Sequence, residues 1–401
     1  MLEDEFEWHR KQNLKPIINV SGTMTGLGAS IAAPGVAKAT AEAMANFVSI
    51  HQAQEKASEV IARLTGAEAG FLTASASAGI TLSIAACMTG LDPARVEDLP
   101  INTGEKNEVI VQCGHLCGYG APVAQAVALS GARVRSVGQS TLCTDYQITG
   151  AIGRATAAAL FVVSHHVVHY GQCPLQRFVT LCHEAEIPVI VDAASEQELR
   201  SFLHAGADIV VYSGHKFLGG PTSGIVAGRR DLVRAAYLQN IGIGRGMKIG
   251  KESIFGAIAA LEAWESRDHA AIRVEETKAL GSWTHALLNI PGVTATRVGD
   301  PTGNPIDRLQ VDIDPAVVGI SAATVARLLG ERDPAIIVRN HGLDLGYFQL
   351  DPCNLLAGQA ERVAKELREV LSSAKTTAAQ PGDTEIARNG STRAYLDWGR
   401  S

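Results

Sequence analysis

The sequence lacks the features that mark membrane proteins, secreted proteins and nucleic-acid binders. No run of about 18 uncharged apolar residues occurs in its 401 residues, so we expect no membrane span. The acidic first residues have no apolar core and do not resemble a signal peptide. Basic residues form no tract, and 35 lysines and arginines face 41 acidic residues, for a net charge of -6. We therefore expect neither a membrane nor a nucleic acid as partner.

Cysteines are few and follow no disulfide or zinc pattern. There are seven, an odd number, scattered from Cys87 to Cys353. Cys113 and Cys117 are four apart, but no second Cys/His pair at zinc spacing accompanies them, so we expect no metal site. The pattern is typical of reduced thiols in a cytoplasmic enzyme. Hydrophobic residues make up 46% of the chain, as in a well-buried globular protein.

Short apolar runs alternate with helical patterns through the middle of the chain. Strands are expected at 108–111, 132–134, 159–163, 188–192, 207–212 and 224–228. Helices are expected at 52–64, 80–88, 121–129 and 175–185. Apolar strands separated by helices predict an α/β fold with a mostly parallel sheet covered on both faces.

The composition changes after about Ser266, which predicts more than one domain. The later elements alternate less regularly and indicate a compact α+β unit. We expect an N-terminal segment that packs with the small domain, a large domain, a small C-terminal α+β domain and a polar tail. Their predicted ranges are 1–48, 49–266, 267–373 and 374–401.

One lysine occupies an unusual place in the segment 212–221. Lys216 follows an apolar strand and lies among serine, glycine and histidine residues. This position suits a Schiff-base lysine better than a solvated surface charge, and the glycines let the main chain approach a cofactor. The alternative interpretation is a surface lysine in a glycine turn.

An aspartate and a serine-rich segment are further candidates for binding the same ligand. Asp192 ends a buried strand, where ligands of open α/β sheets gather and where a carboxylate can hold a pyridinium nitrogen. Taken by itself, Asp192 would be interpreted as a helix N-cap. Residues 73–79 open a small-residue helix whose N-terminus could bind phosphate or could simply be capped. Because Asp192 and Lys216 each follow a strand, the pair predicts pyridoxal 5'-phosphate (PLP) as the cofactor.

These motifs resemble those of the fold-type I PLP enzymes, the aspartate aminotransferase superfamily. More narrowly, the chain resembles the selenocysteine synthase (seryl-tRNA selenium transferase)-like branch, and within it the D-glucosaminate-6-phosphate ammonia-lyase type. The resemblance covers roughly residues 10 to 370 and rests on the segments 18–28, 191–194, 213–216 and 244–252. It implies a seven-stranded sheet in a large PLP-binding domain, together with a homodimer or larger homo-oligomer.

The resemblance also assigns roles to residues of the large domain. Lys216 would form the Schiff base, and Asp192 would pair with the pyridine nitrogen. The phosphate would be held by Ser75, Ala76, Ser77, Ser213 and His215. His115 would stack on the cofactor ring, with Tyr119 as the rival for that place.

Further candidates would face the substrate. His165 or His169 follows another strand and could exchange protons with the substrate, although loop histidines are often structural. Arg245, Lys248 and Lys251 form a basic cluster that could bind anions or be a solvated helix start. Fold-type I enzymes often bind the substrate carboxylate with a small-domain arginine, which implies Arg339; an ordinary surface arginine is the alternative.

The predicted activity is a lyase reaction on an amino acid or amino sugar acid. Lys216 would remove the α-proton, and β-elimination would then yield ammonia and a keto acid. A racemase, an aldolase or an aminotransferase acting on a small amino acid would use the same groups, and a non-catalytic protein on a PLP fold is a further alternative. The acidic chain argues against a tRNA substrate.

Overall fold

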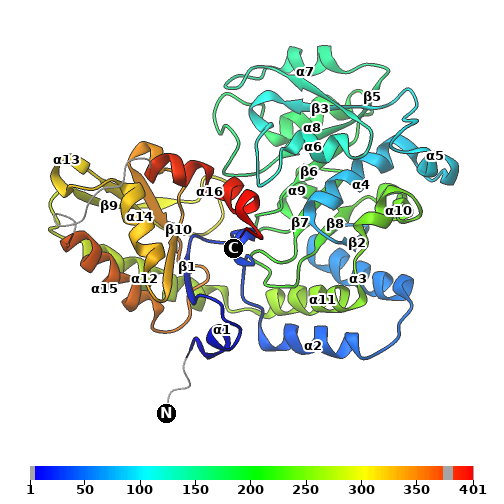
Figure 1. The fold of residues 1–401 in the computed structure, drawn as a ribbon. Helices are drawn as coiled ribbons and strands as arrows, with labels where there is room; N and C mark the ends of the chain where they lie inside the picture. Colours follow the sequence, from blue (N-terminus) through cyan, green and yellow to red (C-terminus); the bar gives the residue numbers. More distant parts are fainter. Residues whose placement is uncertain (1–4, 374–382, 401) are drawn as a thin grey trace. The chain divides into compact units, whose positions relative to one another are not determined.

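The computed structural model describes residues 5–373 and 383–400 and divides the chain into two compact units (Figure 1). Unit 2 runs from Ser30 to Arg267, and unit 1 combines the segments on either side of it. The segment 1–48, expected as one N-terminal piece, is shared between the units at Ala29 and Ser30. Within unit 2, helix α2 (Pro34–Met44) packs against α11 (Lys251–Ser266).

Unit 2 is built on a seven-stranded sheet with the strand order β2-β8-β7-β6-β5-β3-β4. In that order the strands are Ala69–Thr73, Gly224–Gly228, Ile209–Ser213, Val189–Asp192, Thr156–Val162, Glu108–Gln112 and Arg133–Val137. Neighbouring strands are parallel except that β8 runs antiparallel to both β2 and β7. The mostly parallel seven-stranded sheet predicted for the large domain is confirmed.

Helices cover both faces of this sheet because its central strands are apolar on both sides. Besides α2 and α11 they are α3 (Ile50–Thr65), α4 (Ala76–Thr89), α5 (Pro93–Asp98), α6 (Val123–Ala128), α7 (Asp145–Ala151), α8 (Leu175–His183), α9 (Ser201–His204) and α10 (Arg230–Leu238), with 3-10 turns η2 (Cys113–His115), η3 (Gln239–Ile241) and η4 (Ile243–Met247). Helix α4 is buried almost throughout. Its small residues are required by close packing, since a Cβ at Gly79 would meet Val211 at 2.8 Å.

Unit 1 combines two small sheets with helices. A three-stranded antiparallel sheet has the order β12 (Tyr347–Leu350), β10 (Asp307–Ile313) and β9 (Val293–Gly299), and β1 (Ile17–Val20) pairs in parallel with β11 (Ala335–Val338). The helices are α1 (Glu7–Lys11), α12 (His269–Leu287), α13 (Pro315–Val318), α14 (Ala322–Glu331), α15 (Gln359–Ser372) and α16 (Asp383–Asp397), with 3-10 turns η1 (Thr25–Leu27) and η5 (Leu343–Leu345). The core surrounds the fully buried Trp283, whose indole N–H donates to the carbonyl of Ala360 over 3.0 Å. The α+β architecture predicted for the small domain is confirmed.

The polar segment expected as a tail contains a helix. Residues 374–382 lie outside the described part of the chain, while α16 begins at Asp383. The Asp383 carboxylate accepts a hydrogen bond from the Thr324 hydroxyl (2.7 Å) and pairs with Arg327 (3.2 Å), which joins α16 to α14.

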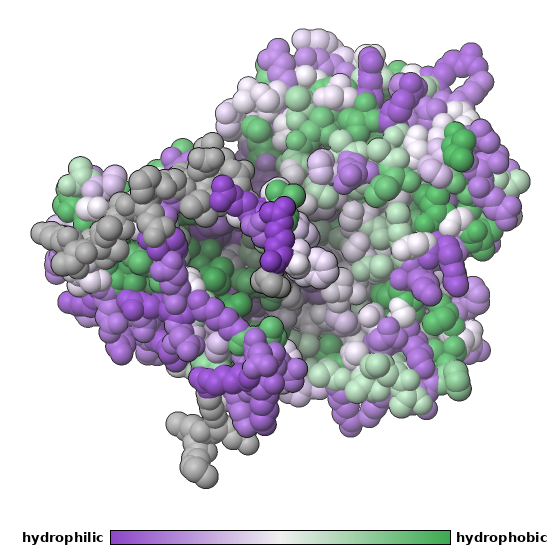
Figure 2. Space-filling view, viewed as in Figure 1, coloured by the Kyte–Doolittle hydropathy of each residue, from purple (hydrophilic) through white to green (hydrophobic). Residues whose placement is uncertain are grey.

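The visible surface is of mixed polarity, and the cysteines form no disulfides. Figure 2 shows hydrophilic and hydrophobic side chains interspersed on the visible face, as is ordinary for folded proteins. All seven cysteines are free thiols. Among the described helices, none combines the length and apolar character that a membrane crossing requires.

Candidate active site

The candidate site lies where the parallel strands β6 and β7 end. Their register places Asp192, the last residue of β6, opposite Val211 of β7, and Lys216 lies in the loop that follows β7. The carboxyl ends of parallel strands share one edge of a sheet, which is where open α/β folds bind ligands. The two predicted cofactor residues are thus brought to the same edge.

Lys216 is partly buried and its amine has a defined partner. The Nζ atom donates a hydrogen bond to the hydroxyl oxygen of Ser195, which lies in the loop after β6. The positive charge of Lys216 also offsets part of the rise that burial causes in the pKa of Asp192. Sequence reasoning missed Ser195; its one available signal is a hydroxyl three residues after the strand-end aspartate.

Asp192 is a buried carboxylate, with 5% of its surface exposed. Its Oδ1 accepts a hydrogen bond from the main-chain N–H of Ala194 over 3.1 Å. Burial raises the pKa of Asp192 to about 6, because the hydrogen bond and the charge of Lys216 offset only part of the desolvation cost. A further cation at this carboxylate would therefore be bound favourably.

The loop after β7 presents a buried imidazole. The Ser213 hydroxyl and His215 Nδ1 are hydrogen-bonded at 2.9 Å, and the carbonyl of His215 accepts from the Ser30 hydroxyl at 2.7 Å. Burial and the nearby Lys216 charge lower the pKa of His215, so its ring is held neutral. Its Nε2 is buried and has no hydrogen-bond partner among the described residues. This atom is a donor or acceptor available to a ligand.

The N-terminus of α4 lies beside the same loop. Ser75 caps the helix, with its hydroxyl accepting from the N–H of Ala78 over 3.1 Å. Gly224 pairs with both Ser213 and Thr73, and a Cβ at Gly224 would meet the carbonyl oxygen of Ser75 at 2.2 Å. The glycine thus permits the close approach of the two loops predicted to hold phosphate.

Tyr119 lies beside the N-terminus of α4. Its phenol and the Ser77 hydroxyl are hydrogen-bonded at 3.2 Å. Burial raises the pKa of Tyr119, so the phenol stays protonated. The contact with Ser77 favours a role for Tyr119 near the helix N-terminus rather than over the cofactor ring.

His115, the preferred stacking residue, is buried at the end of η2. Its ring packs edge-on against Phe161, with the centroids 4.5 Å apart. Nδ1 accepts a hydrogen bond from the main-chain N–H of Val162. Burial, with a smaller effect of His169, lowers the pKa of His115 to about 4. The ring is therefore neutral at neutral pH.

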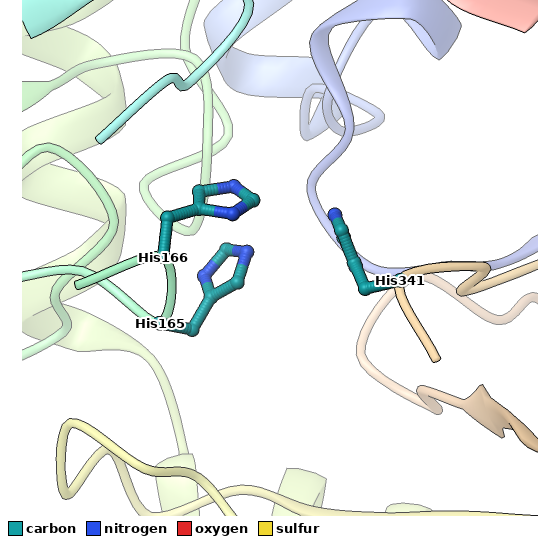
Figure 3. A group of neighbouring side chains, drawn as sticks. All are labelled: His165, His166 and His341. Atoms are coloured by element: carbon teal, nitrogen blue, oxygen red, sulfur yellow. The ribbon is translucent and has the colours of Figure 1, made fainter. Parts of the chain in front are cut away.

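The loop after β5 carries the other predicted histidines. His165 and the adjacent His166 have their ring centroids 3.9 Å apart (Figure 3). His169 is exposed, and its charge influences the buried His115. The loop is thus close to the site, while a proton-transfer role for His165 or His169 stays a prediction.

The predicted basic cluster separates into two parts. Lys251 is engaged with the main chain, since its Nζ donates to the carbonyls of Met44 and Asn46. Arg245 and Lys248 are exposed on and just after η4. The end of η4 lies beside the loop before α4, because the N–H of Ala74 donates to the carbonyl of Met247 over 3.4 Å.

Arg339 belongs to unit 1 and is buried rather than on the surface, with 7% of its area exposed. One guanidinium nitrogen donates to the carbonyl of Ser21 over 3.3 Å. The neighbouring Arg308 takes both nearby carboxylates, Asp300 and Asp351, each at 2.7 Å. Burial and the Arg308 charge lower the pKa of Arg339 to about 10. Within the described residues, no carboxylate forms an ion pair with Arg339, so an anionic ligand would be stabilised there.

The chain matches a known protein family over more than half of its length. A family model for L-seryl-tRNA selenium transferase matches residues 17–289. The chain belongs to the L-seryl-tRNA selenium transferase family. It is 39% identical over 366 residues to D-glucosaminate-6-phosphate ammonia lyase of Salmonella typhimurium, covering 91% of this chain and 98% of that protein. It is also 37% identical over 358 residues to 5'-C-glycyluridine monooxygenase-decarboxylase of a Streptomyces species, covering 89% of this chain and 90% of that protein.

Solved structures of similar proteins agree with the family. The structure of D-glucosaminate-6-phosphate ammonia-lyase matches with a TM-score of 0.83 and 38% identity, over 94% of this chain and all of that one (100%). Aspartate aminotransferase from Thermus thermophilus matches with a TM-score of 0.55 and 16% identity over 92% of this chain and 93% of that one, which shows the fold alone. The predicted aspartate aminotransferase-like fold and the predicted branch are both confirmed.

Proposed function

We propose that this family member is a PLP-dependent lyase that removes ammonia from an amino sugar acid or a related amino acid and leaves a keto acid. The observation that carries the proposal is the meeting of Asp192 and Lys216 at one sheet edge. The similarity to an ammonia lyase over nearly its whole length supports the reaction type and the substrate class.

The residues at the sheet edge fit PLP. The buried Asp192 carboxylate would pair with the pyridine nitrogen and keep it protonated, since a cation there offsets the desolvation that raises its pKa. The unpartnered Nε2 of His215, Ser213 and the first turn of α4 (Ser75, Ala76, Ser77) would hold the phosphate. When bound, PLP would supply an electron sink for a carbanion beside the substrate amine.

Lys216 would act as both the cofactor anchor and the proton carrier. Its Nζ would take the α-proton of the substrate and then donate it to the leaving group as that group departs. His115 would lie against the cofactor ring as a neutral imidazole. This arrangement avoids placing a second positive charge next to a protonated pyridine.

Charged residues would select an acidic substrate. Arg339 would bind the carboxylate, since it is buried and forms no ion pair with a carboxylate of the described residues. Arg245 and Lys248, exposed beside the α4 loop, would attract anionic groups of the substrate. His165 or His169 would exchange a proton with the substrate away from Lys216.

The proposal is tested with purified full-length protein. A visible absorbance band that borohydride bleaches, with the reduced cofactor found on the Lys216 peptide by mass spectrometry, is the expected result. Release of ammonia and a keto acid from an amino sugar acid, without any 2-oxo acid acceptor, would establish the lyase. A colourless protein that PLP cannot restore would overturn the cofactor assignment.

A second candidate follows from the Streptomyces relative, which is named for oxygenation and decarboxylation of a glycyl nucleoside and is almost as similar to this chain. The two reactions differ in what they consume and release. Oxygen uptake with carbon dioxide release would identify the monooxygenase-decarboxylase type, and ammonia release under nitrogen would identify the lyase. Dependence on a 2-oxo acid would instead indicate an aminotransferase, while deuterium exchange without net product would indicate a racemase.

We also propose that the enzyme is at least a homodimer, as the family resemblance implies. Light scattering of the cofactor-loaded protein tests this, and a fully active monomer would contradict it.

A further inference from the structure

We propose that Ser195 is a positioning residue for Lys216: its hydroxyl oxygen holds Nζ at the sheet edge and presents the amine for proton transfer in one orientation. The functional consequence rests on the proposed function, but the contact itself is a property of the folded chain.

The contact joins two neighbouring loops. Ser195 lies in the loop after β6, and Lys216 lies in the loop after β7. The two strands are paired in parallel, so both loops leave the sheet at the same edge. A hydrogen bond between them fixes the far end of a long, flexible side chain, which otherwise has many rotamers.

Hydrogen bonds of the main-chain N–H groups on either side of Ser195 fix the path of its loop. The N–H of Ala193 donates to the carbonyl of Val211 over 2.9 Å, which extends the β6–β7 pairing by one residue. The N–H of Ala194 donates to the Asp192 carboxylate, and the N–H of Glu196 donates to the carbonyl of Ala193 over 3.1 Å. The turn that orients Asp192 therefore also orients Ser195.

The chemistry of a hydroxyl suits this position. A carboxylate next to Lys216 would stabilise the ammonium form and hold back a neutral amine. A hydroxyl oxygen accepts a hydrogen bond from either form of the amine, more strongly from the ammonium, and adds no charge. Ser195 can therefore hold the nitrogen in place while Lys216 still changes its protonation state.

The test compares Ser195→Ala with the hydroxyl-retaining Ser195→Thr. Full-length protein freed of cofactor is labelled with the amine reagent trinitrobenzenesulfonate over a range of pH, and labelling of the Lys216 peptide is quantified by mass spectrometry. Removing the acceptor disfavours the ammonium form, so Ser195→Ala should lower the apparent pKa of Lys216 by about one unit. Ser195→Thr should match the parent protein.

A matched control removes another serine hydroxyl from unit 2. Ser266 lies at the end of α11, where its hydroxyl donates to the carbonyl of Glu262 over 3.1 Å, and Ser266→Ala should leave the labelling profile unchanged. If Ser195→Ala and the parent protein share one labelling profile, the proposal is wrong. Circular dichroism establishes that each variant is folded, and should Ser195→Ala not fold, Ser195→Gly carries the same expectation.

Steady-state kinetics provides a second readout. Ser195→Ala should lower kcat about tenfold with little change in KM, because substrate binding is intact while proton transfer is less well aligned. Ser195→Thr should recover most of kcat. Failure of the proposed function would be recognised separately, since it would appear in the parent protein as the absence of borohydride-trapped cofactor, whereas the labelling profile of Lys216 needs no cofactor.

Discussion

The main-chain N–H of Val162 donates a hydrogen bond to Nδ1 of His115 over 3.2 Å. A main-chain amide is always a donor, so Nδ1 must accept, and the proton of the neutral ring lies on Nε2. To become an imidazolium, His115 would have to break this hydrogen bond while it stays buried, which agrees with its pKa of about 4. The ring is therefore a fixed donor through Nε2.

We predict that His115 keeps this neutral tautomer over the whole working range of pH. Nitrogen NMR of protein labelled at histidine should show the Nε2–H form of His115 unchanged from about pH 8 to about pH 5, well below the ordinary histidine pKa of about 6.5. His115→Gln should remove the assigned signal. Titration of His115 near the ordinary value would contradict the assignment.

The lowered pKa of His115 predicts that the free energy of unfolding depends on pH in the acid range. The unfolded chain binds a proton at His115 near pH 6.5, but the folded chain does so only near pH 4. Stability from the neutral ring is thus complete above about pH 6.5 and is lost as pH falls towards 4, by roughly 3 kcal/mol. Urea unfolding should show a flatter acid slope for His115→Gln than for the parent protein. The exposed His204→Gln serves as the control and should keep the parent slope.

Lys216→Ala should abolish cofactor attachment. Without the amine, borohydride should fix no PLP to the chain, and turnover should fall by about 10³-fold because anchor and proton carrier are lost together. Mass spectrometry after reduction and an ammonia assay check the two effects. Lys278→Ala, on the exposed face of α12, should retain both attachment and activity. Normal turnover by Lys216→Ala would contradict the mechanism.

Asp192 should couple cofactor binding to pH. Its folded pKa of about 6 lies above the ordinary value, so the buried carboxylate costs stability as pH rises from about 4 to about 6, by about 3 kcal/mol in all. A bound pyridinium offsets this cost. The rise in melting temperature on adding PLP should therefore be larger at about pH 7.5 than at about pH 5.

Asp192→Asn removes both the stability cost of the buried carboxylate and its ion pair with a bound pyridinium. We expect the pH dependence of the PLP effect to disappear and kcat to fall by about 10²-fold. Asp208→Asn is the contrast: Asp208 is a buried carboxylate paired with Arg229 and His183, so this change should lower the melting temperature and leave the PLP effect dependent on pH. Equal PLP effects at both pH values in the parent protein would refute the pairing.

Arg339→Gln should weaken substrate binding. Loss of the buried guanidinium should raise KM for a carboxylate substrate by about 10²-fold, because a charge-assisted pair is lost. Initial rates over a range of substrate concentrations measure this change. Arg297→Gln, an exposed position on β9, should keep the parent KM. An unchanged KM in Arg339→Gln would remove this residue from the substrate site.

Sequence reasoning found the parts of the fold that depend on periodicity. The expected strands at 224–228 and 159–163 correspond closely to β8 and β5, because strands buried on both faces are continuous apolar runs. Helix α16 was not predicted, since its segment is polar and joins α14 through the carboxylate of Asp383. Such a single side-chain contact leaves no periodic signal.

The candidate site was predictable where chemistry is visible in residue type. Lys216 and Asp192 stand out because a charged residue at the end of an apolar strand, or a few residues beyond it, is unusual. Ser195 does not stand out, since serine is common in loops and its contact depends on the exact paths of two of them. Likewise, no local pattern reveals that Arg308 pairs with the two acids near Arg339.

Gly224 is paired with both of the strands that lead into the candidate site. Strand β8 runs antiparallel between β2 and β7, so this one residue faces Thr73 on one side and Ser213 on the other. A methyl group added here would press on the main chain of Ser75. The segment that leads to Lys216 and the segment that leads to the N-terminus of α4 therefore both lie against Gly224. A substitution at Gly224 would therefore disturb both segments at once.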